Sequence, residues 1–216
     1  IYIFTLVPEF LMRFIVWMLI HTIYRIRKLG LERIPERGPA ILVCNHISFV
    51  DALVIAGCVR RPVRFVMYYK IFQIPVLSFI FRTAGAIPIA GKKEDPAMLE
   101  SAFERIGECL DQGQLICIFP EGRITSDGMM GVFRPGIERI ISRNPVPVIP
   151  IALGGLADSL FARGSGRSLR NFPWLLWAKI SLLVGRPLEP EAVSADVLHD
   201  DVAELLAEAE SIYAPT

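Results

Sequence analysis

The sequence has few of the residues that bind metals or form disulfides, with only three histidines and four cysteines in 216 residues. The histidines are far apart and no two cysteines have C-x-x-C spacing, which argues against a metal site or a dithiol motif. The cysteines stand in apolar runs, as is typical of reduced core residues in a domain on the cytoplasmic side of a membrane. We therefore predict no metal and no bound cofactor.

The motif of a serine hydrolase is also missing. No G-x-S-x-G sequence is present, so the nucleophile elbow of the α/β hydrolases is not expected. Cys44 stands two residues before His46, which leaves a thiol nucleophile open as an alternative. Cysteines in apolar runs are more often structural than reactive.

A third absence is an uninterrupted apolar run that could cross a membrane. Residues 1–24 carry only two charges, Glu9 and Arg13, but these and a neighbouring proline interrupt the run before the roughly 20 residues that a span needs. Basic residues follow from Arg25 onward, as on the cytoplasmic flank of membrane segments. We expect residues 1–28 to form a membrane-associating helical segment that lies in the interface, with a buried core helix as the alternative.

Charge is unevenly distributed although the formal net charge is only +1, which gives no reason to expect a nucleic acid partner. Every charged residue after Asp51 and up to Lys93 is basic, and every charged residue in 189–210 is acidic. We expect the basic part to face anionic lipid, phosphate or an acidic carrier protein, and the acidic part to be a solvated helix. The candidate cluster for steering an acidic carrier is Arg60, Arg61 and Arg64.

Short apolar runs alternate with helical patterns along residues 29–216, which predicts one α/β domain with a central, mostly parallel sheet flanked by helices. Residues 71–81 are apolar around a proline and are expected to form a short packed helix or a membrane-facing loop. The expected strands are 40–44, 63–67, 85–89, 115–119, 146–153 and 179–184, and the expected helices begin near residues 49, 95 and 194.

The first candidate site follows the buried strand 40–44, where Asn45 and His46 stand at the carboxyl end that presents chemistry in α/β sheets. Asp51 falls in the first turn of the next helix, so its carboxylate can orient the imidazole of His46 as a general base. An alternative remains open. Ser48 and Asp51 have the spacing of a capping box, in which Asp51 only caps the helix.

A second candidate turn, Pro120 to Arg123, follows strand 115–119. Gly122 lets the backbone approach a ligand closely, and the planar guanidinium of Arg123 suits a phosphate or a carboxylate. The alternative for this turn is a solvent-exposed loop with an ordinary surface arginine.

Four segments together resemble the blocks of the PlsC-type glycerolipid acyltransferases, in the same order and at similar spacing. The resemblance extends over about residues 30–185, and the run 119–125 with Gly128 is most similar to the acyltransferase part of the 2-acylglycerophosphoethanolamine acyltransferases. That part is often joined to a transporter or an acyl-ACP synthetase, so the chain is expected to be a piece of a longer protein at the cytoplasmic face of a bacterial inner membrane. The four segments are 45–51, 85–89, 119–123 and 148–151.

The resemblance implies a direct transfer of a fatty acyl group from acyl-ACP or acyl-CoA to the free glycerol hydroxyl of a lysophospholipid, without an acyl-enzyme. His46 would be the general base and Asp51 would orient it. The residues implied in binding the acceptor are Asn45, Glu121, Gly122 and Arg123, with Arg123 on the phosphate.

One departure from the family pattern bears on the acceptor. In phosphatidate-forming relatives the second block usually ends in an arginine, whereas here it ends in Ala90 and Gly91. Lys92 or Lys93 is expected to contact the phosphate instead. The departure favours a lysophosphatidylethanolamine-type acceptor, with 1-acyl-sn-glycerol 3-phosphate as the alternative. A catalytically silent scaffold at a membrane surface is a further alternative, although His46, Asp51 and Glu121 are intact.

Overall fold

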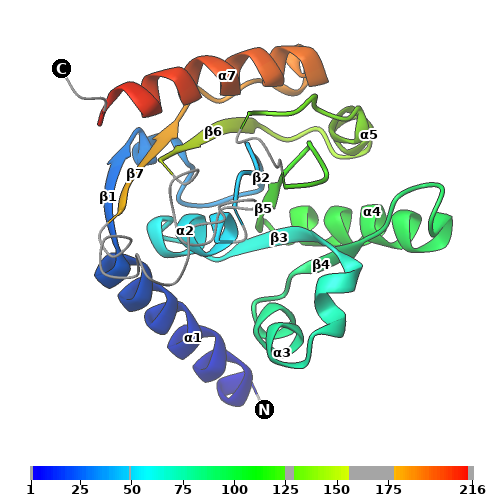
Figure 1. The fold of residues 1–216 in the computed structure, drawn as a ribbon. Coiled ribbons are helices and arrows are strands. Elements are labelled where there is room, and N and C mark those ends of the chain that lie inside the picture. Colours follow the sequence, from blue (N-terminus) through cyan, green and yellow to red (C-terminus); the bar gives the residue numbers. More distant parts are fainter. Residues whose placement is uncertain (1, 49, 125–128, 156–177, 214–216) are drawn as a thin grey trace.

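The computed structural model describes residues 2–48, 50–124, 129–155 and 178–213, which build an α/β unit around a seven-stranded sheet (Figure 1). The strand order is β1-β7-β6-β2-β5-β3-β4. Neighbouring strands are parallel except β6 and β7, so the predicted, mostly parallel sheet is confirmed. The strands are β1 (Tyr24–Leu29), β2 (Ala40–Cys44), β3 (Val63–Tyr68), β4 (Ile87–Ile89), β5 (Leu115–Ile118), β6 (Val148–Gly154) and β7 (Ala178–Val184).

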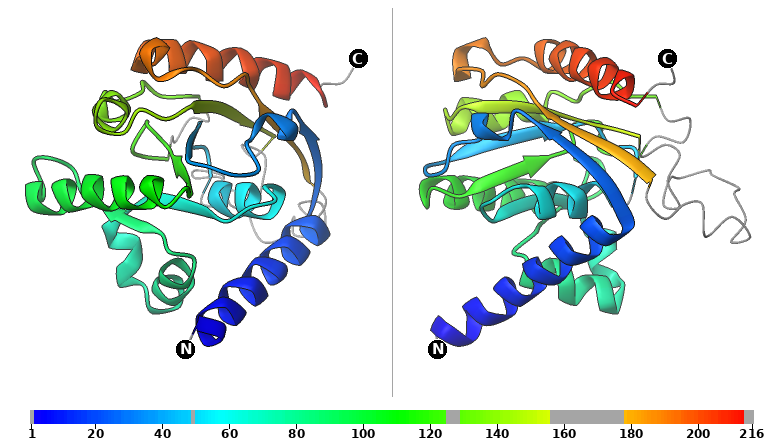
Figure 2. Two further views of the ribbon diagram at one scale, coloured as in Figure 1. Left: turned by 180° about the vertical axis from the view of Figure 1, so that it is seen from behind. Right: turned by 90° about the vertical axis from the view of Figure 1, so that its left-hand side faces the viewer.

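Helices cover both faces of the sheet (Figures 1 and 2). Alternate residues of β2 point to opposite faces: Leu42 and Cys44 belong to the core under α1 and α2, whereas Ile41 and Val43 belong to the core under α4, α5 and α7. Burial on both faces explains why β2 is apolar at every position. The helices are α1 (Tyr2–Ile23), α2 (Asp51–Cys58), α3 (Pro75–Thr83), α4 (Pro96–Asp111), α5 (Gly136–Arg143) and α7 (Ala195–Ser211).

Two expected elements differ in extent from the sequence prediction. The expected strand 85–89 is reduced to β4, because Gly85 adopts a φ of 66° and forms the turn that follows α3. The apolar run 71–81 contains α3, preceded by a short 3-10 helix, Tyr69–Gln73. Pro75 begins α3, where the missing N–H of proline costs nothing. The residues Thr125 and Gly128 of the family pattern lie outside the described residues.

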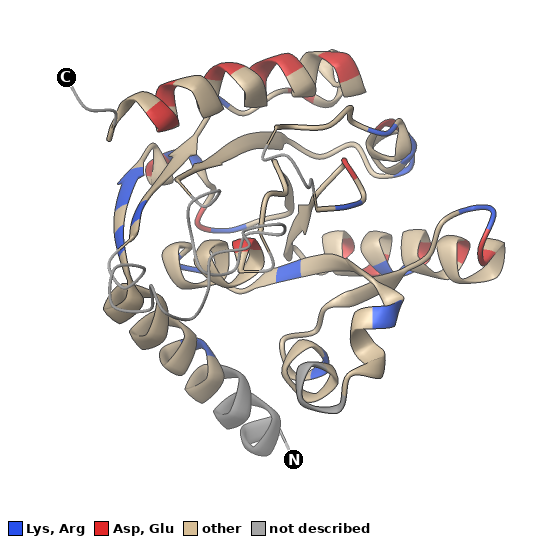
Figure 3. Cartoon of the chain, in the orientation of Figure 1, with Lys and Arg blue, Asp and Glu red and all other residues tan. Residues whose placement is uncertain are grey.

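The acidic C-terminal segment forms the amphipathic helix α7, as expected. Leu198 and Val202 are fully buried against the sheet. Acidic residues recur along the length of the helix (Figure 3), and all of them except the half-buried Asp201 are exposed. Ser194 caps the helix by accepting a hydrogen bond from the backbone N–H of Val197 at 3.1 Å. The acidic run is therefore explained by a solvated helix face.

The N-terminal segment is divided between a helix and the sheet. Near its C-terminal end α1 packs closely on α2, where a Cβ on Gly57 would lie 2.3 Å from Ile20 Cδ1. The sheet then begins at Tyr24, so the expected segment boundary at residue 28 falls inside β1. Tyr24 and Ile26 turn toward the core while the basic residues of 25–28 stay exposed. This pattern suits the place of β1 at the edge of the sheet. Among the described residues no helix is long and apolar enough to cross a membrane.

Candidate active site

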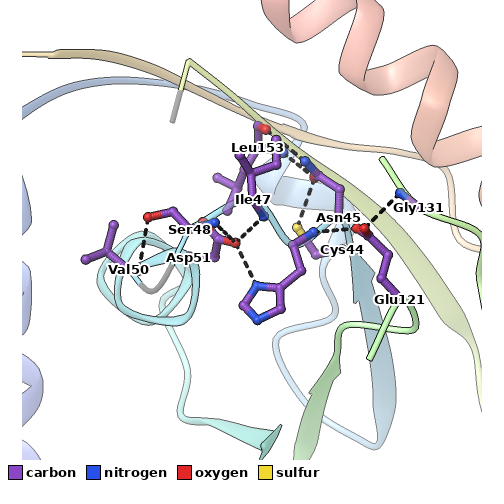
Figure 4. Close-up of polar contacts among 10 residues, drawn as sticks. Cys44, Asn45, Ile47, Ser48, Val50, Asp51, Glu121, Gly131 and Leu153 are labelled. Atoms are coloured by element: carbon purple, nitrogen blue, oxygen red, sulfur yellow. Dashed lines mark hydrogen bonds and ion pairs between the residues drawn. The ribbon is translucent and has the colours of Figure 1, made fainter. Parts of the chain in front are cut away.

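The histidine and the aspartate that the sequence singled out are in direct contact. β2 ends at Cys44, His46 lies in the following turn, and α2 begins at Asp51 (Figure 4). Nδ1 of His46 lies 2.8 Å from Oδ2 of Asp51. The carboxylate is fully buried and the imidazole is partly exposed. Nε2 of His46 makes no hydrogen bond with any described residue, so it remains available for a further hydrogen bond.

Asp51 also holds the turn that carries the histidine. Its Oδ2 accepts hydrogen bonds from the backbone N–H groups of Ile47 at 2.8 Å and Ser48 at 2.9 Å. Val50 occupies the N-cap position of α2 and has no side chain that could cap. The two interpretations of Asp51 therefore hold together, because one oxygen satisfies the free N–H groups of the turn and orients the imidazole.

Glu121 secures the same turn from the end of β5. Its Oε1 accepts a hydrogen bond from the backbone N–H of His46 at 2.6 Å, and Oε2 accepts one from Gly131 at 2.8 Å (Figure 4). Burial raises the pKa of this carboxyl group, and the two backbone N–H groups oppose the shift. In the described contacts Glu121 therefore positions backbone, and its predicted contact with a substrate stays a prediction.

Asn45 joins the end of β2 to the end of β6. Its side chain is fully buried, donates to the carbonyl of Leu153 at 3.0 Å and accepts from the N–H of Leu153 at 2.9 Å. This pair of bonds extends the β2–β6 pairing by a side chain in place of backbone. The predicted contact of Asn45 with the acceptor stays a prediction.

Aromatic residues that the sequence analysis did not select support the imidazole. The ring of His46 stacks on Phe119 with centroids 4.3 Å apart, and Phe119 stacks on Phe65 at 6.4 Å. A pocket with mainly apolar walls begins beside Phe65 and runs between α1, α2 and α3, where its walls include Val16, Leu53 and Phe81. The apolar side of the site is therefore continuous from His46 to this pocket.

The basic residues chosen from the sequence are exposed at the same edge of the sheet. Arg123 lies in the turn after Glu121, and Lys92 and Lys93 follow β4, the third strand along from β2. Gly122 adopts a φ of 67°, which a residue with a Cβ rarely adopts. Their predicted contacts with a phosphate stay predictions.

Arg134 is the candidate residue that sequence reasoning missed. A Cβ on Gly122 would lie 2.9 Å from Cζ of Arg134, so the guanidinium lies directly against the glycine backbone. The backbone N–H of Arg134 donates to the carbonyl of Pro120 at 3.0 Å. A basic residue shortly after the Pro-Glu-Gly-Arg turn was the only signal in the sequence.

The cluster Arg60, Arg61 and Arg64 does not join the site. The guanidinium of Arg61 donates to the carbonyls of Pro35, Gly38 and Gly113, near the amino ends of β2 and β5. Burial lowers the pKa of Arg61. These contacts lie at the edge of the sheet opposite His46, so the expectation that this cluster steers a carrier toward the site is not supported for Arg61.

The fold and the site together define the class of the protein. A mostly parallel sheet with a His-x4-Asp pair after one central strand and a Pro-Glu-Gly-Arg turn after its neighbour is the arrangement of the PlsC-type glycerolipid acyltransferases. A model of the acyltransferase family matches residues 25–154, and the chain belongs to this family.

Two relatives of the chain are named as 1-acyl-sn-glycerol-3-phosphate acyltransferases. It is 28% identical over 190 residues to a chloroplastic 1-acyl-sn-glycerol-3-phosphate acyltransferase of Arabidopsis thaliana, covering 88% of this chain and 50% of the relative. It is 31% identical over 130 residues to a 1-acyl-sn-glycerol-3-phosphate acyltransferase of Pseudomonas aeruginosa, covering 60% of this chain and 48% of the relative. The chain thus spans about half the length of these curated relatives.

The fold is shared with a solved structure. The crystal structure of the 1-acyl-sn-glycerophosphate acyltransferase PlsC from Thermotoga maritima has a TM-score of 0.73 to this chain and covers 99% of it, with 89% of that chain covered in turn. The sequence identity is 22%. The similarity confirms the architecture of the sheet and its flanking helices.

Proposed function

We propose that the chain is an O-acyltransferase that moves a fatty acyl group from an acyl thioester to the glycerol hydroxyl of a lysophospholipid. The observation that carries the proposal is the imidazole of His46, which Asp51 holds through Nδ1 while Nε2 is left for substrate. This arrangement suits a general base acting on a hydroxyl near neutral pH.

The proposed reaction needs one proton carrier. Nε2 of His46 takes the proton of the acceptor hydroxyl as the oxygen attacks the thioester carbonyl. The carbon–sulfur bond then breaks, and the departing thiolate takes the proton back from the imidazolium. The buried carboxylate of Asp51 fixes the tautomer and stabilises the transient charge.

Direct transfer is favoured over a cysteine intermediate. Cys44 is fully buried, its Sγ–H donates to Oδ1 of Asn45 at 3.5 Å, and burial raises the pKa of its thiol well above the ordinary value. A thiol in this state supplies very little thiolate. The alternative of a Cys44 nucleophile is therefore disfavoured.

The names of the relatives favour 1-acyl-sn-glycerol 3-phosphate as the acceptor. This reverses the preference drawn from the sequence, which placed a lysophosphatidylethanolamine-type acceptor first. The second candidate keeps one observation in its favour, because Gly91 stands where phosphatidate-forming relatives usually have an arginine. Both acceptors present a phosphate and a free glycerol hydroxyl, so the reaction is the same.

The acyl chains are proposed to occupy the apolar side of the molecule. The pocket beside Phe65 is the candidate place for a fatty acyl chain, because it adjoins the ring that stacks on Phe119 next to His46. Large apolar side chains are exposed on α1 and α3, two of the three helices that flank this pocket, among them Phe10 at 74% and Phe79 at 70%. Such surfaces are typical of proteins that bind a membrane interface. We further propose that the protein acts at the cytoplasmic face of a bacterial inner membrane and that it is fused to a transporter or an acyl-ACP synthetase. The acyl donor is proposed to be acyl-ACP or acyl-CoA.

The test is acyl transfer from acyl-CoA and acyl-ACP to 1-acyl-sn-glycerol 3-phosphate and lysophosphatidylethanolamine in detergent micelles. His46→Ala is expected to lower kcat at least about 100-fold, as for loss of a general base. His199→Ala removes a histidine of α7 and serves as the matched control. Equal rates for native protein and His46→Ala would overturn the mechanism, and no transfer to either acceptor by folded native protein would overturn the function.

A further inference from the structure

Residues 129–135 are bound to the Pro-Glu-Gly-Arg turn at several points. The N–H of Gly131 donates to Glu121 at 2.8 Å, and the N–H of Arg134 donates to the carbonyl of Pro120 at 3.0 Å. Phe133, which belongs to this segment, is buried with 4% of its surface exposed. Backbone contacts therefore fix the position of residue 134 whatever its side chain is.

The side chain of Arg134 is held against the turn and is still available to a ligand. Its guanidinium lies against Gly122, where any Cβ would displace it. Arg134 is exposed, and among the described residues no carboxylate or carbonyl accepts a hydrogen bond from its guanidinium. A guanidinium carries five N–H donors and keeps its charge at all physiological pH values. Within the described part of the chain, the guanidinium donors of Arg134 therefore have no acceptor.

A second arginine, Arg123, is the next residue after Gly122 and is also exposed. Two arginines at the same turn suit a phosphate, since each guanidinium can offer two parallel N–H bonds. The turn follows β5, the strand next to β2, so the phosphate would lie one strand away from the histidine that faces the hydroxyl.

We propose that Arg134 is a binding residue for the acceptor phosphate and that, together with Arg123, it favours a phosphate monoester over a phosphate diester. This inference rests on the proposed acyl transfer. A phosphate monoester carries a charge of roughly −1.5 to −2 at pH 7, whereas a diester carries one negative charge and has one oxygen fewer to accept bonds. Two guanidinium groups therefore balance the negative charge of a monoester, whereas beside a diester one positive charge stays uncompensated.

The inference also accounts for the departure in the second block. The arginine that phosphatidate-forming relatives carry there is replaced by Gly91, and Arg134 supplies a guanidinium from a different segment. On this account the missing arginine does not argue against 1-acyl-sn-glycerol 3-phosphate.

The test measures kcat and KM for 1-acyl-sn-glycerol 3-phosphate and for lysophosphatidylethanolamine with Arg134→Ala, Arg134→Lys and the native protein. For Arg134→Ala we expect KM for the monoester to rise roughly 10- to 100-fold, in proportion to a lost charge-assisted hydrogen bond, with kcat changed less than about threefold. KM for the diester should change less, so the preference for the monoester falls. Arg134→Lys should recover part of the affinity, because it keeps the charge without the fork.

Arg37→Ala is the matched control, since Arg37 is an exposed arginine at the opposite edge of the sheet. Unchanged KM in Arg134→Ala would overturn the inference while leaving acyl transfer intact. An equal loss of kcat for both acceptors, accompanied by a lower unfolding temperature, would assign Arg134 a purely structural role and would overturn it as well. Equal acyl transfer rates for the native protein and His46→Ala, by contrast, would contradict the proposed function itself.

Discussion

The two edges of the sheet use charged side chains in opposite ways. At the carboxyl edge two buried acids, Asp51 and Glu121, accept hydrogen bonds from backbone N–H groups around His46. At the amino edge Arg61 and Arg64 donate to backbone carbonyls of the loops that enter the strands. Acids thus hold one edge, and arginines hold the other.

The difference follows from the direction of the helices. In a parallel sheet the loops at the carboxyl edge lead into helix N-termini, which have unpaired N–H groups, and the loops at the amino edge leave helix C-termini, which have unpaired carbonyls. Ala84 follows α3 and Gly113 follows α4, and their carbonyls are bound by Arg64 and Arg61. An acid fits the first edge and an arginine fits the second.

The comparison also gives a physical reason why the proposed chemistry is assigned to the carboxyl edge alone. At the amino edge the guanidinium of Arg61 is already used by three carbonyls. At the carboxyl edge Oδ2 of Asp51 and both oxygens of Glu121 accept from backbone N–H groups and from Nδ1 of His46. Nε2 of His46 is left with no described partner. A base with one unused nitrogen is able to act on a substrate, whereas an arginine bound to three carbonyls is not.

The largest effect is expected from Asp51→Asn, which breaks the carboxyl edge at the histidine. The amide keeps the shape of the side chain but no longer stabilises the imidazolium, so kcat should fall roughly 10³- to 10⁴-fold. The measurement is steady-state acyl transfer. Asp95→Asn is the matched control, because Asp95 also caps a helix, by accepting from Met98 N–H at 2.9 Å, and asparagine caps equally well. A similar loss in both variants would mean that folding was measured and not catalysis.

Arg61→Ala should destabilise the loops at the amino edge and leave the rate of acyl transfer unchanged. Three carbonyls lose a charged donor, so the free energy of unfolding is expected to fall by about 2–4 kcal/mol. Chemical denaturation gives this value, and kcat per folded molecule should stay within about a factor of two of native. Arg60→Ala removes a neighbouring exposed guanidinium and should change stability by less than about 0.5 kcal/mol. A loss of kcat per folded molecule in Arg61→Ala would show that the amino edge also takes part in catalysis and would contradict the proposed difference between the two edges.

Glu121→Gln should have a smaller effect on the rate than Asp51→Asn. The amide nitrogen cannot accept a hydrogen bond, so either His46 or Gly131 loses the partner of its backbone N–H, at a cost of about 1–3 kcal/mol. We expect kcat to fall roughly 10- to 100-fold with a lower unfolding temperature. Glu138→Gln is the control, because Glu138 accepts the N–H of Ala195 at 2.8 Å away from the site, and it should affect stability alone. Native kcat in Glu121→Gln would show that the carboxylate does not position His46.

The smallest expected effect is a pH dependence of stability at Glu121. Its folded pKa is raised above the ordinary 4.5 by burial, so the folded state holds the proton more tightly than the unfolded state does. The stabilising contribution of protonated Glu121 is fully present below pH 4.5 and is lost as the pH rises through the folded pKa. The free energy of unfolding of the native protein relative to Glu121→Gln should therefore decrease above pH 4.5. Denaturation of both proteins at several pH values measures it, and a constant difference would contradict the shift.

Local sequence was enough to predict the contact between His46 and Asp51, because the two residues are five positions apart across one strand-to-helix turn. Most of the sheet was predictable for a similar reason, since the strands other than β1 are largely apolar runs. β1 carries three basic residues and was not expected as a strand. The contact of Arg134 with Gly122 was not predictable, because neither helical nor strand spacing relates the two residues. No local pattern in the sequence indicates a contact of this kind.

The contacts of Arg61 with three backbone carbonyls were not predictable for the same physical reason. Its carbonyl partners lie 26, 23 and 52 residues away in sequence, and a basic cluster looks the same in a sequence whether it faces solvent or ties loops together. The basic residues from Arg25 onward were predicted to flank a membrane segment. The structure places them on the exposed face of the edge strand β1, and a sequence shows the same charges in either case.

The junction of α1 and β1 has a mechanical consequence. The helix ends at Ile23 and the strand begins at Tyr24, with no residue between them, so α1 is a rigid lever attached to the edge of the sheet. If α1 rests on a bilayer as proposed, its tilt fixes the angle and the height at which the whole sheet stands above the lipid. A few glycines inserted after Ile23 would remove this direct connection, and the packing of Ile20 on α2 would then be left to hold the sheet at that angle.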